Sequence, residues 1–272
     1  MEKMLPESEL ARDERFVRSK IEDRIFDPRG AKIAARNTGP AKMATDRPAA
    51  AERSRSLMHG IFVGEVQALE GAGRTCFDFD DTEAPFQLKL DMARQCWDES
   101  RHCEISIKLG DHMGTEIGEY TESTFLYSAA CNPDPVLRLC GVNRALEGLA
   151  IDVFSTMKEF GNESGDPVLE FCEDWMLADE VTHVKMGSDW LRRLTDNDPE
   201  RRQQALDFQR AVDKLFSFGG FRGEEEENPV HLARKFRSLA GFSEDEISDL
   251  VDTAAEAYAE AQAMQTAAAA GA

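Results

Sequence analysis

Two stretches decide the fold of this chain, Asp98-Glu99-Ser100-Arg101-His102 and Asp179-Glu180-Val181-Thr182-His183. Each contains a Glu-x-x-His unit inside a long segment with helical periodicity. Because residues three apart lie on one face of a helix, each unit directs a carboxylate and an imidazole toward one point. Such a pair of units is typical of a two-metal site inside a four-helix bundle, in which the other two helices each supply a glutamate.

Spacing identifies the two glutamates that complete this set as Glu65 and Glu147. Glu65 precedes Glu99 by 34 residues, and Glu147 precedes Glu180 by 33. The midpoints of both intervals fall in turn-forming sequence, so two antiparallel hairpins would bring the four carboxylates to one height. Glu65 also interrupts an apolar helix face, where a buried carboxylate needs a partner. We expect Glu65 and Glu147 to be bridging ligands, and Glu70 is the rival for the first position.

The rest of the sequence predicts an all-α protein. We expect residues 49–195 to form a four-helix bundle, two antiparallel hairpins joined by a long crossover over 113–132. Residues 1–48 mix charge with Pro and Gly and form an N-terminal arm, 196–265 form additional helices that pack on the bundle, and 266–272 form a disordered tail. No strand is predicted. The predicted helices cover residues 49–77, 84–112, 136–160, 168–194, 199–216, 230–239 and 243–264.

Residues beside the ligands are candidates for orienting them, because bound carboxylates and imidazoles need hydrogen-bond partners. For each candidate, an ordinary polar contact between helices is the alternative. Glu173, two turns before Glu180, could also face the bundle interior, but capping of a helix or contact with solvent is the favoured interpretation. The candidate orienting residues are His59, Asp98, Arg101, Asn143 and Asp179.

Composition and charge argue against several classes of protein. The net charge is -20, and so acidic a chain is a poor partner for nucleic acid. The six cysteines include no Cys-x-x-Cys pair, which argues against a zinc ribbon, a rubredoxin module and a secreted disulfide framework. No apolar run is long enough for a membrane span, and the N-terminus lacks a signal-peptide core. We therefore expect a cytoplasmic protein with no membrane partner.

At the ligand positions the chain resembles the ferritin-like carboxylate proteins, and specifically the family catalogued as DUF455. Four segments within residues 50–195 carry the resemblance. It implies a ferritin-like bundle with a di-metal site, and it implies no particular reaction. The four segments are His59–Glu65, Asp98–His102, Arg144–Glu147 and Asp179–Gly187.

Four carboxylates and two imidazoles suit iron and manganese, so we expect two metal ions, Fe/Fe or Mn/Fe. Two adjacent metals can share the electrons that reduce O₂. The sequence therefore predicts a non-haem oxidase or oxygenase that uses O₂ to oxidise a small organic substrate. No dinucleotide fingerprint is present, so electrons would come from an external donor or from the substrate. Exposed bundle faces allow a homodimer. The residues expected to line an apolar pocket beside the metals are Phe62, Leu69, Cys103, Leu146, Ile151 and Met176.

Three other functions compete with this prediction. The first is a ferritin- or rubrerythrin-like ferroxidase or peroxide scavenger, although no cysteine quartet is present to feed electrons to it. The second is a radical generator, which needs a tyrosine beside the metals. Tyr120, Tyr127 and Tyr258 all lie outside the predicted ligand helices, which argues against it. The third is a non-enzymatic helical scaffold that metal ions stabilise, and O₂-dependent activity would separate it from an oxygenase.

Overall fold

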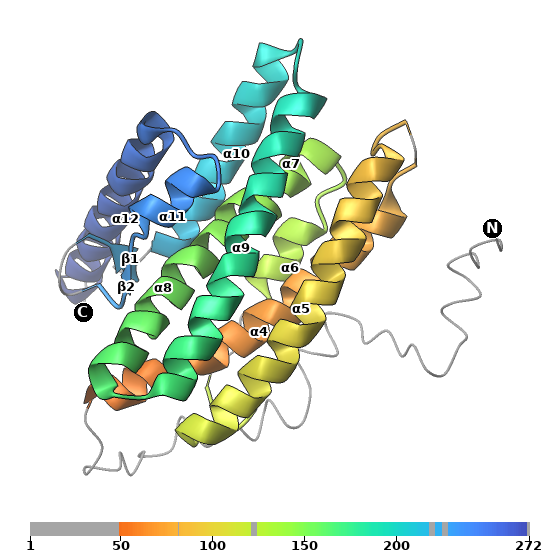
Figure 1. The fold of residues 1–272 in the computed structure, drawn as a ribbon. Coiled ribbons are helices and arrows are strands. Elements are labelled where there is room, and N and C mark those ends of the chain that lie inside the picture. The colour runs from red at the N-terminus through yellow and green to blue at the C-terminus, as the bar shows by residue number, and fades with distance from the viewer. Residues whose placement is uncertain (1–48, 81, 121–123, 218–220, 225–227, 271–272) are drawn as a thin grey trace.

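A computed structural model describes residues 49–80, 82–120, 124–217, 221–224 and 228–270. It is mostly helical, as the sequence predicted, and the predicted arm over 1–48 lies outside the described residues. Figure 1 shows long helices side by side, with the C-terminal helices against one side of them. None of the described helices is both long and apolar enough to cross a membrane.

The first hairpin consists of α4 (Ala49–Asp78) and α5 (Phe86–Met113), which pack closely along their length. Asp80 organises the turn between them, because its Oδ1 accepts hydrogen bonds from the backbone N–H groups of Thr82 at 2.7 Å and Glu83 at 3.2 Å. Such bonds from an aspartate to the following backbone favour a tight turn. The two helices therefore run antiparallel, as their spacing predicted.

The second hairpin consists of α8 (Glu147–Ser164) and α9 (Pro167–Leu194). Gly165 ends α8 with a φ of 72°, a left-handed conformation that glycine adopts without a steric penalty. Asp166 then caps α9, its side chain accepting from the N–H groups of Val168 and Leu169 at 3.1 Å each. Pro167 occupies the first helical position, where a missing N–H costs nothing. The turn thus reverses the chain within three residues.

The two hairpins pack on each other through α5 against α9 and α4 against α8. A crossover joins them and contains a short helix, α6 (Phe125–Ala130), while α7 (Pro135–Leu139) begins the segment predicted as the third helix. In Figure 1 the four long helices lie next to one another, with α6 and α7 on the α4 side of α9. The crossover therefore has more structure than the sequence predicted.

The third predicted helix, expected over 136–160, is continuous but irregular. Between α7 and α8 lies η1 (Cys140–Leu146), a π-helix in which backbone hydrogen bonds span five residues. All seven of its residues are buried. Gly141 faces Phe208, since a Cβ there would lie 2.7 Å from the ring. The irregular turn thus lies in the interior, immediately before Glu147.

The C-terminal elements are α10 (Pro199–Ser217), α11 (Arg234–Leu239) and α12 (Glu244–Ala270), with a parallel pair of two-residue strands, β1 (Arg222–Gly223) and β2 (Val230–His231). The helix predicted over 230–239 is therefore shorter than expected, because its first two residues pair as a strand. α12 continues to Ala270, so 266–270 of the tail expected to be disordered are helical, and 271–272 lie outside the described residues.

Buried arginines attach these elements to the hairpins. Arg144 of η1 donates to Gln209 Oε1 of α10 at 2.7 Å and to Ser188 Oγ of α9 at 2.5 Å, and it also pairs with Glu246 of α12. Arg237 of α11 is fully buried and donates to Asp152 of α8, with Nη2 2.6 Å from Oδ2. Buried charges persist only when they are paired in this way. The added helices are thus packed as part of the same core.

Candidate metal centre

The four long helices bring all six predicted ligands together in the protein interior. Glu65 comes from α4 and Glu147 is the first residue of α8. The two Glu-x-x-His units come from α5 and α9. All six side chains are buried, with 4% or less of each residue exposed. The ligand set predicted from spacing therefore converges on one point, and Glu70 is not part of it.

These six residues form two overlapping groups. Glu65 and His102 belong to the first group and Glu147 and His183 to the second, while Glu99 and Glu180 belong to both. Within each group one ligand atom per residue lies within 4.8 Å of the others. The groups could each hold one ion, with two shared carboxylates between them. Glu65 and Glu147, expected from the sequence to bridge, each belong to one group only (the terminal ligands), whereas Glu99 and Glu180 belong to both (the shared ligands).

Both imidazoles present Nδ1 to the carboxylates. His102 Nδ1 lies 3.0 Å from Glu65 Oε2, 3.2 Å from Glu99 Oε2 and 3.2 Å from Glu180 Oε1. His183 Nδ1 lies 3.2 Å from Glu99 Oε1, 3.5 Å from Glu180 Oε1 and 3.8 Å from Glu147 Oε2. Each ring thus has one nitrogen among oxygen atoms, where a metal ion would meet mixed oxygen and nitrogen donors.

The Nε2 atoms of the two histidines point away from the ligand groups and contact the two aspartates that begin the motifs, each aspartate contacting the histidine of the other motif. Asp98, next to Glu99, lies 3.3 Å from Nε2 of His183. Asp179, next to Glu180, lies 3.3 Å from Nε2 of His102. Each aspartate therefore binds the histidine of the opposite motif. A carboxylate at Nε2 keeps the proton on that nitrogen and leaves Nδ1 free to bind a metal.

Arg101 connects the two aspartates. Its Nη2 pairs with Asp98 Oδ1 and lies 3.3 Å from Asp179 Oδ2. The guanidinium lies over the ring of Trp175, 4.7 Å from its centroid, and that ring also meets His102 edge-on at 6.1 Å. Three of the five candidate orienting residues thus form one network around the histidines.

Gln95 is a partner that the sequence reasoning missed. Its Nε2 donates to Glu99 Oε1 at 3.0 Å and to Glu147 Oε1 at 2.9 Å, and its Oε1 accepts from Asn143 at 2.6 Å. Asn143 therefore reaches the ligands through Gln95. The available signal was the spacing, because Gln95 lies one turn before Glu99 on the same buried face of α5.

His59 lies elsewhere. Its Nε2 accepts a hydrogen bond from the backbone N–H of Gly118 at 2.8 Å, and its ring meets Tyr120 edge-on at 5.6 Å. It therefore ties α4 to the crossover. Glu173 also differs from expectation, because it is fully buried and neither carboxylate oxygen has a hydrogen-bond partner among the described residues. Its neighbours on α9, Leu169 and Met176, belong to the apolar core.

Buried polar atoms without a hydrogen-bond partner make the centre compatible with a bound cation. Glu99 Oε2, both oxygens of Glu180 and Nδ1 of His183 are buried without a hydrogen bond of good geometry. Native interiors rarely leave such atoms unsatisfied, since each costs roughly 1–3 kcal/mol. All four atoms belong to the ligand groups, so metal ions would satisfy them. These buried Glu and His side chains could hold metal ions.

The electrostatics of the centre agree with this arrangement. Burial raises the pKa of both terminal ligands, Glu65 and Glu147, well above the usual carboxyl range, and neighbouring carboxylates raise it further. Burial alone would also raise the pKa of Glu99, but the two imidazoles more than offset this and lower it. Burial opposes charge on the imidazoles too, yet the surrounding carboxylates raise the pKa of His102 and of His183. When no cation is bound, protons on Glu65, Glu147, His102 and His183 thus offset the negative charge of the carboxylates.

A family model described as a protein of unknown function, DUF455, matches residues 2–248. The chain belongs to the DUF455 family. The match extends well beyond the motifs within 50–195, and it includes most of the first 48 residues as well as α10 and α11. No curated protein shows significant similarity to the sequence.

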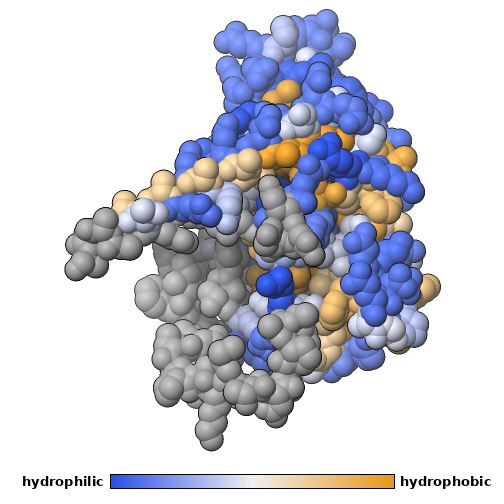
Figure 2. Space-filling model, turned by 90° about the vertical axis from the view of Figure 1, so that its left-hand side faces the viewer, coloured by the Kyte–Doolittle hydropathy of each residue, from blue (hydrophilic) through white to orange (hydrophobic). Residues whose placement is uncertain are grey.

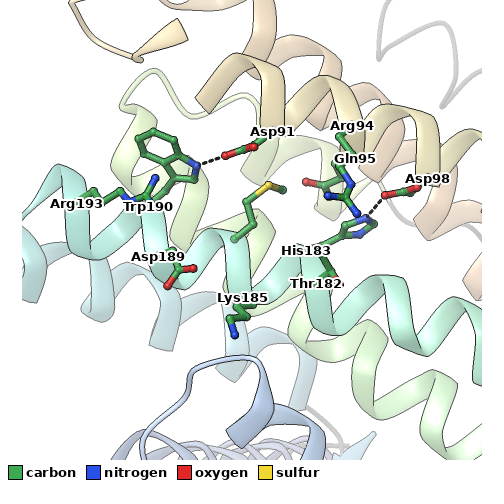
Figure 3. A pocket seen from close by; sticks show the side chains of 11 residues that line it. Asp91, Arg94, Gln95, Asp98, Thr182, His183, Lys185, Asp189, Trp190 and Arg193 are labelled. Atoms are coloured by element: carbon green, nitrogen blue, oxygen red, sulfur yellow. Dashed lines mark hydrogen bonds and ion pairs between the residues drawn. The ribbon is translucent and has the colours of Figure 1, made fainter. Parts of the chain in front are cut away.

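The surroundings of the centre in this DUF455 chain differ on its two sides. A polar pocket of about 230 Å³ opens between α5 and α9 beside His183. Figure 3 shows Asp98 directed at the His183 ring within this pocket, and Asp91 directed at Trp190. An apolar cavity of about 400 Å³ lies between α4 and α8 and reaches Glu65. Of the six residues predicted to line an apolar pocket, Leu146 is the one that lines this cavity.

Proposed function

We propose that the protein is a ferritin-like di-metal enzyme, an oxidase or oxygenase that uses O₂ to oxidise a small organic substrate. One observation carries the proposal, namely the two overlapping ligand groups that share Glu99 and Glu180. The antiparallel hairpins and the long crossover agree with a ferritin-like bundle, in which helices supply two glutamates and two Glu-x-x-His units.

The donor set favours iron or manganese. Carboxylate oxygens and imidazole nitrogens bind both metals, and no cysteine belongs to either ligand group. Among the described residues the buried donors number four carboxylates and two imidazoles, which suits an Fe/Fe or Mn/Fe pair. Two such ions, when bound, would supply the electrons and the Lewis acidity with which O₂ is reduced.

The protein's own residues would set the conditions of that reaction. Asp98 and Asp179 fix both imidazoles in the tautomer that presents Nδ1. Gln95 joins a shared carboxylate to a terminal one, through Glu99 and Glu147. The ligands are buried, with 4% or less of each residue exposed, which limits their contact with bulk water. Reducing equivalents would come from an external donor or from the substrate.

An apolar cavity beside the ligands favours an oxygenase over iron storage. An oxygenase needs room for an organic substrate beside the metals, which storage of hydrated ions does not, and the large cavity that reaches Glu65 is lined mainly by apolar side chains. Leu149 and Phe154 of α8 and Leu126 of α6 form part of its wall. Small-molecule sites are typically apolar clefts of roughly this size, about 300–1,000 Å³.

Metal analysis and O₂ consumption test the proposal. We expect about two ions per chain after growth with iron and manganese, and oxygen-dependent changes in the optical spectrum. Glu180→Gln should lose both ions, whereas Glu104→Gln, on the exposed surface of α5, should bind as the parent does. A chain that folds fully and binds no metal would refute the enzyme and leave a helical scaffold.

A further inference from the structure

The apolar cavity is a defined space between two of the ligand helices. Its volume is about 400 Å³, and its walls come from α4, α6, η1, α8, the end of α10 and Phe221. All but three of its sixteen lining residues are apolar or glycine, the exceptions being Ser56, Glu65 and Gln67. Several of the apolar ones, including Leu57, Leu149 and Phe216, are only half-buried. An apolar ligand would therefore bury surface that water now contacts.

The inner end of the cavity meets the metal ligands. Glu65 lines it directly, and a smaller cavity of about 40 Å³ shares part of its wall and is lined by both Glu65 and Glu147. Phe154, also in the wall, meets the ring of His102 edge-on at 6.3 Å. The mouth lies at the exposed residues Ser56 and Gly60 of α4. The space thus leads from the surface to the terminal ligands of both groups.

The wall offers no partner for a charged ligand. No Lys, Arg or His is among the described residues that line the cavity, and the one ionisable group is Glu65. The amide of Gln67 is already engaged, because Nε2 donates to the carbonyl oxygen of Val63 at 3.1 Å and Oε1 accepts from the N–H of Tyr127 at 3.0 Å. An anionic group would lose its hydration there without compensation.

The opposite side of the centre differs in character. The pocket beside His183 is lined by three cationic side chains, Arg94, Lys185 and Arg193, together with aspartates. Figure 3 shows these side chains around the opening between α5 and α9. Figure 2 shows that hydrophilic residues cover most of one face of the protein, with hydrophobic residues gathered near its middle. Charged solutes thus have a suitable route on one side, and apolar molecules have one on the other.

We propose that the substrate is an uncharged, largely aliphatic molecule, which enters between α4 and α8 and places its reacting end beside Glu65 and Glu147. The proposal rests on the proposed function for the reaction, but the cavity binds such a molecule whether or not metal ions are present. Affinity comes from the apolar wall, and selection against acids comes from the absence of a cationic side chain among the described lining residues.

Calorimetric titration of the full-length protein with 1-decanol and decanoate tests this inference, because the two probes share a chain length and differ in charge. We expect decanol to bind at least roughly tenfold more tightly than decanoate. Leu126→Trp, which fills the wall of both cavities, should weaken decanol binding by a similar factor. Leu90→Trp, at an exposed position on α5, is the matched control and should bind as the parent does. If Leu126→Trp does not fold, Leu149→Trp replaces it.

Equal binding of decanol and decanoate, or equal binding of decanol to parent and filled variants, would overturn the inference. Absence of decanol binding to the full chain would also overturn it, and would point to occupation of the cavity by another part of the chain. Titrations with and without added iron separate the two proposals. Decanol binding without metal uptake refutes the enzyme alone, whereas metal uptake without decanol binding refutes the substrate class alone.

Discussion

Asp98→Asn should weaken one metal position and leave the other nearly intact. Asp98 contacts Nε2 of His183 at 3.3 Å, and His183 belongs to the ligand group that contains Glu147. Burial would raise the pKa of Asp98, but His183 and Arg101 outweigh it and lower that pKa. The residue is therefore a carboxylate, and the substitution removes a charge that orients the imidazole and increases its basicity.

The structure sets the size of the effect. Loss of such a partner typically lowers metal affinity about 10- to 100-fold, or roughly 1.4–2.7 kcal/mol. The Asp98 side chain is 9% exposed and that of Asp179 is 27% exposed. Because solvent screens the more exposed charge better, we expect a loss near 100-fold for Asp98→Asn. For Asp179→Asn, which acts on His102, a loss near tenfold is expected.

A competition titration with a chromophoric chelator and Mn²⁺ would resolve the two binding steps. Asp91→Asn is the matched control, since Asp91 lies two turns earlier on α5 in the same pocket. Its carboxylate accepts from Trp190 Nε1 at 2.7 Å instead of a histidine. That variant should change either affinity by less than about threefold, because it contacts no ligand.

The reasoning would fail if Asp98→Asn and Asp179→Asn weakened the same binding step. It would also fail if neither variant differed from Asp91→Asn. Either result would mean that the reciprocal contacts are ordinary polar pairs between helices, which was the alternative interpretation of these aspartates from the sequence.

Four further predictions concern the centre and its surroundings. Glu99→Ala should abolish binding of both ions, because Glu99 belongs to both groups, whereas Glu65→Ala should retain about one ion per chain by elemental analysis. Four ligands have a raised pKa, so loading two divalent ions near neutral pH should release about four protons, which an indicator dye would record, and affinity should rise with pH. Because these pKa values are raised by folding, the folded, ion-free chain holds more protons than the unfolded chain. Its free energy of unfolding should therefore fall as pH rises from about 5 to 8. Bound metal should remove this fall, because it displaces the protons. Gly187→Ala should destabilise the fold by about 1–3 kcal/mol in thermal unfolding, because the new Cβ would lie 2.6 Å from Asn143 Cβ; an unchanged melting temperature would contradict that close approach of α9 and η1.

Much of the helical framework could be predicted from the sequence. The helices expected over 49–77 and 168–194 occur at Ala49–Asp78 and Pro167–Leu194. Apolar periodicity and capping residues such as Asp166 are local signals, so they fix the helix boundaries well. The prediction that the four glutamates lie at one height depended on those boundaries. In the structure, the predicted ligand set does come together.

The details that depend on tertiary packing could not be predicted. Which carboxylates are shared depends on how the helices rotate about their axes, and spacing along the chain does not determine that. The reciprocal pairing of the aspartates arises across α5 and α9, so neither motif alone reveals it. Glutamate is usually a surface residue, yet Glu173 lies on the buried face of α9, in the apolar core. The short strands β1 and β2 contain too few residues for an alternating pattern.

The π-helix η1 lies between α7 and α8 in one continuous helical segment, and it changes the direction in which the side chains before it point relative to those after it. Each π turn accommodates about one residue more than an α turn, so the side chains before Cys140 are rotated by about 100° from where an unbroken α-helix would place them. The segment is thus the structural equivalent of a one-residue insertion. Deleting one residue between Cys140 and Leu146 should restore regular helical geometry: Glu147 would stay in register with α9, while α7 and the crossover would turn relative to α4. In this chain a single residue sets the angle at which the second hairpin joins the first.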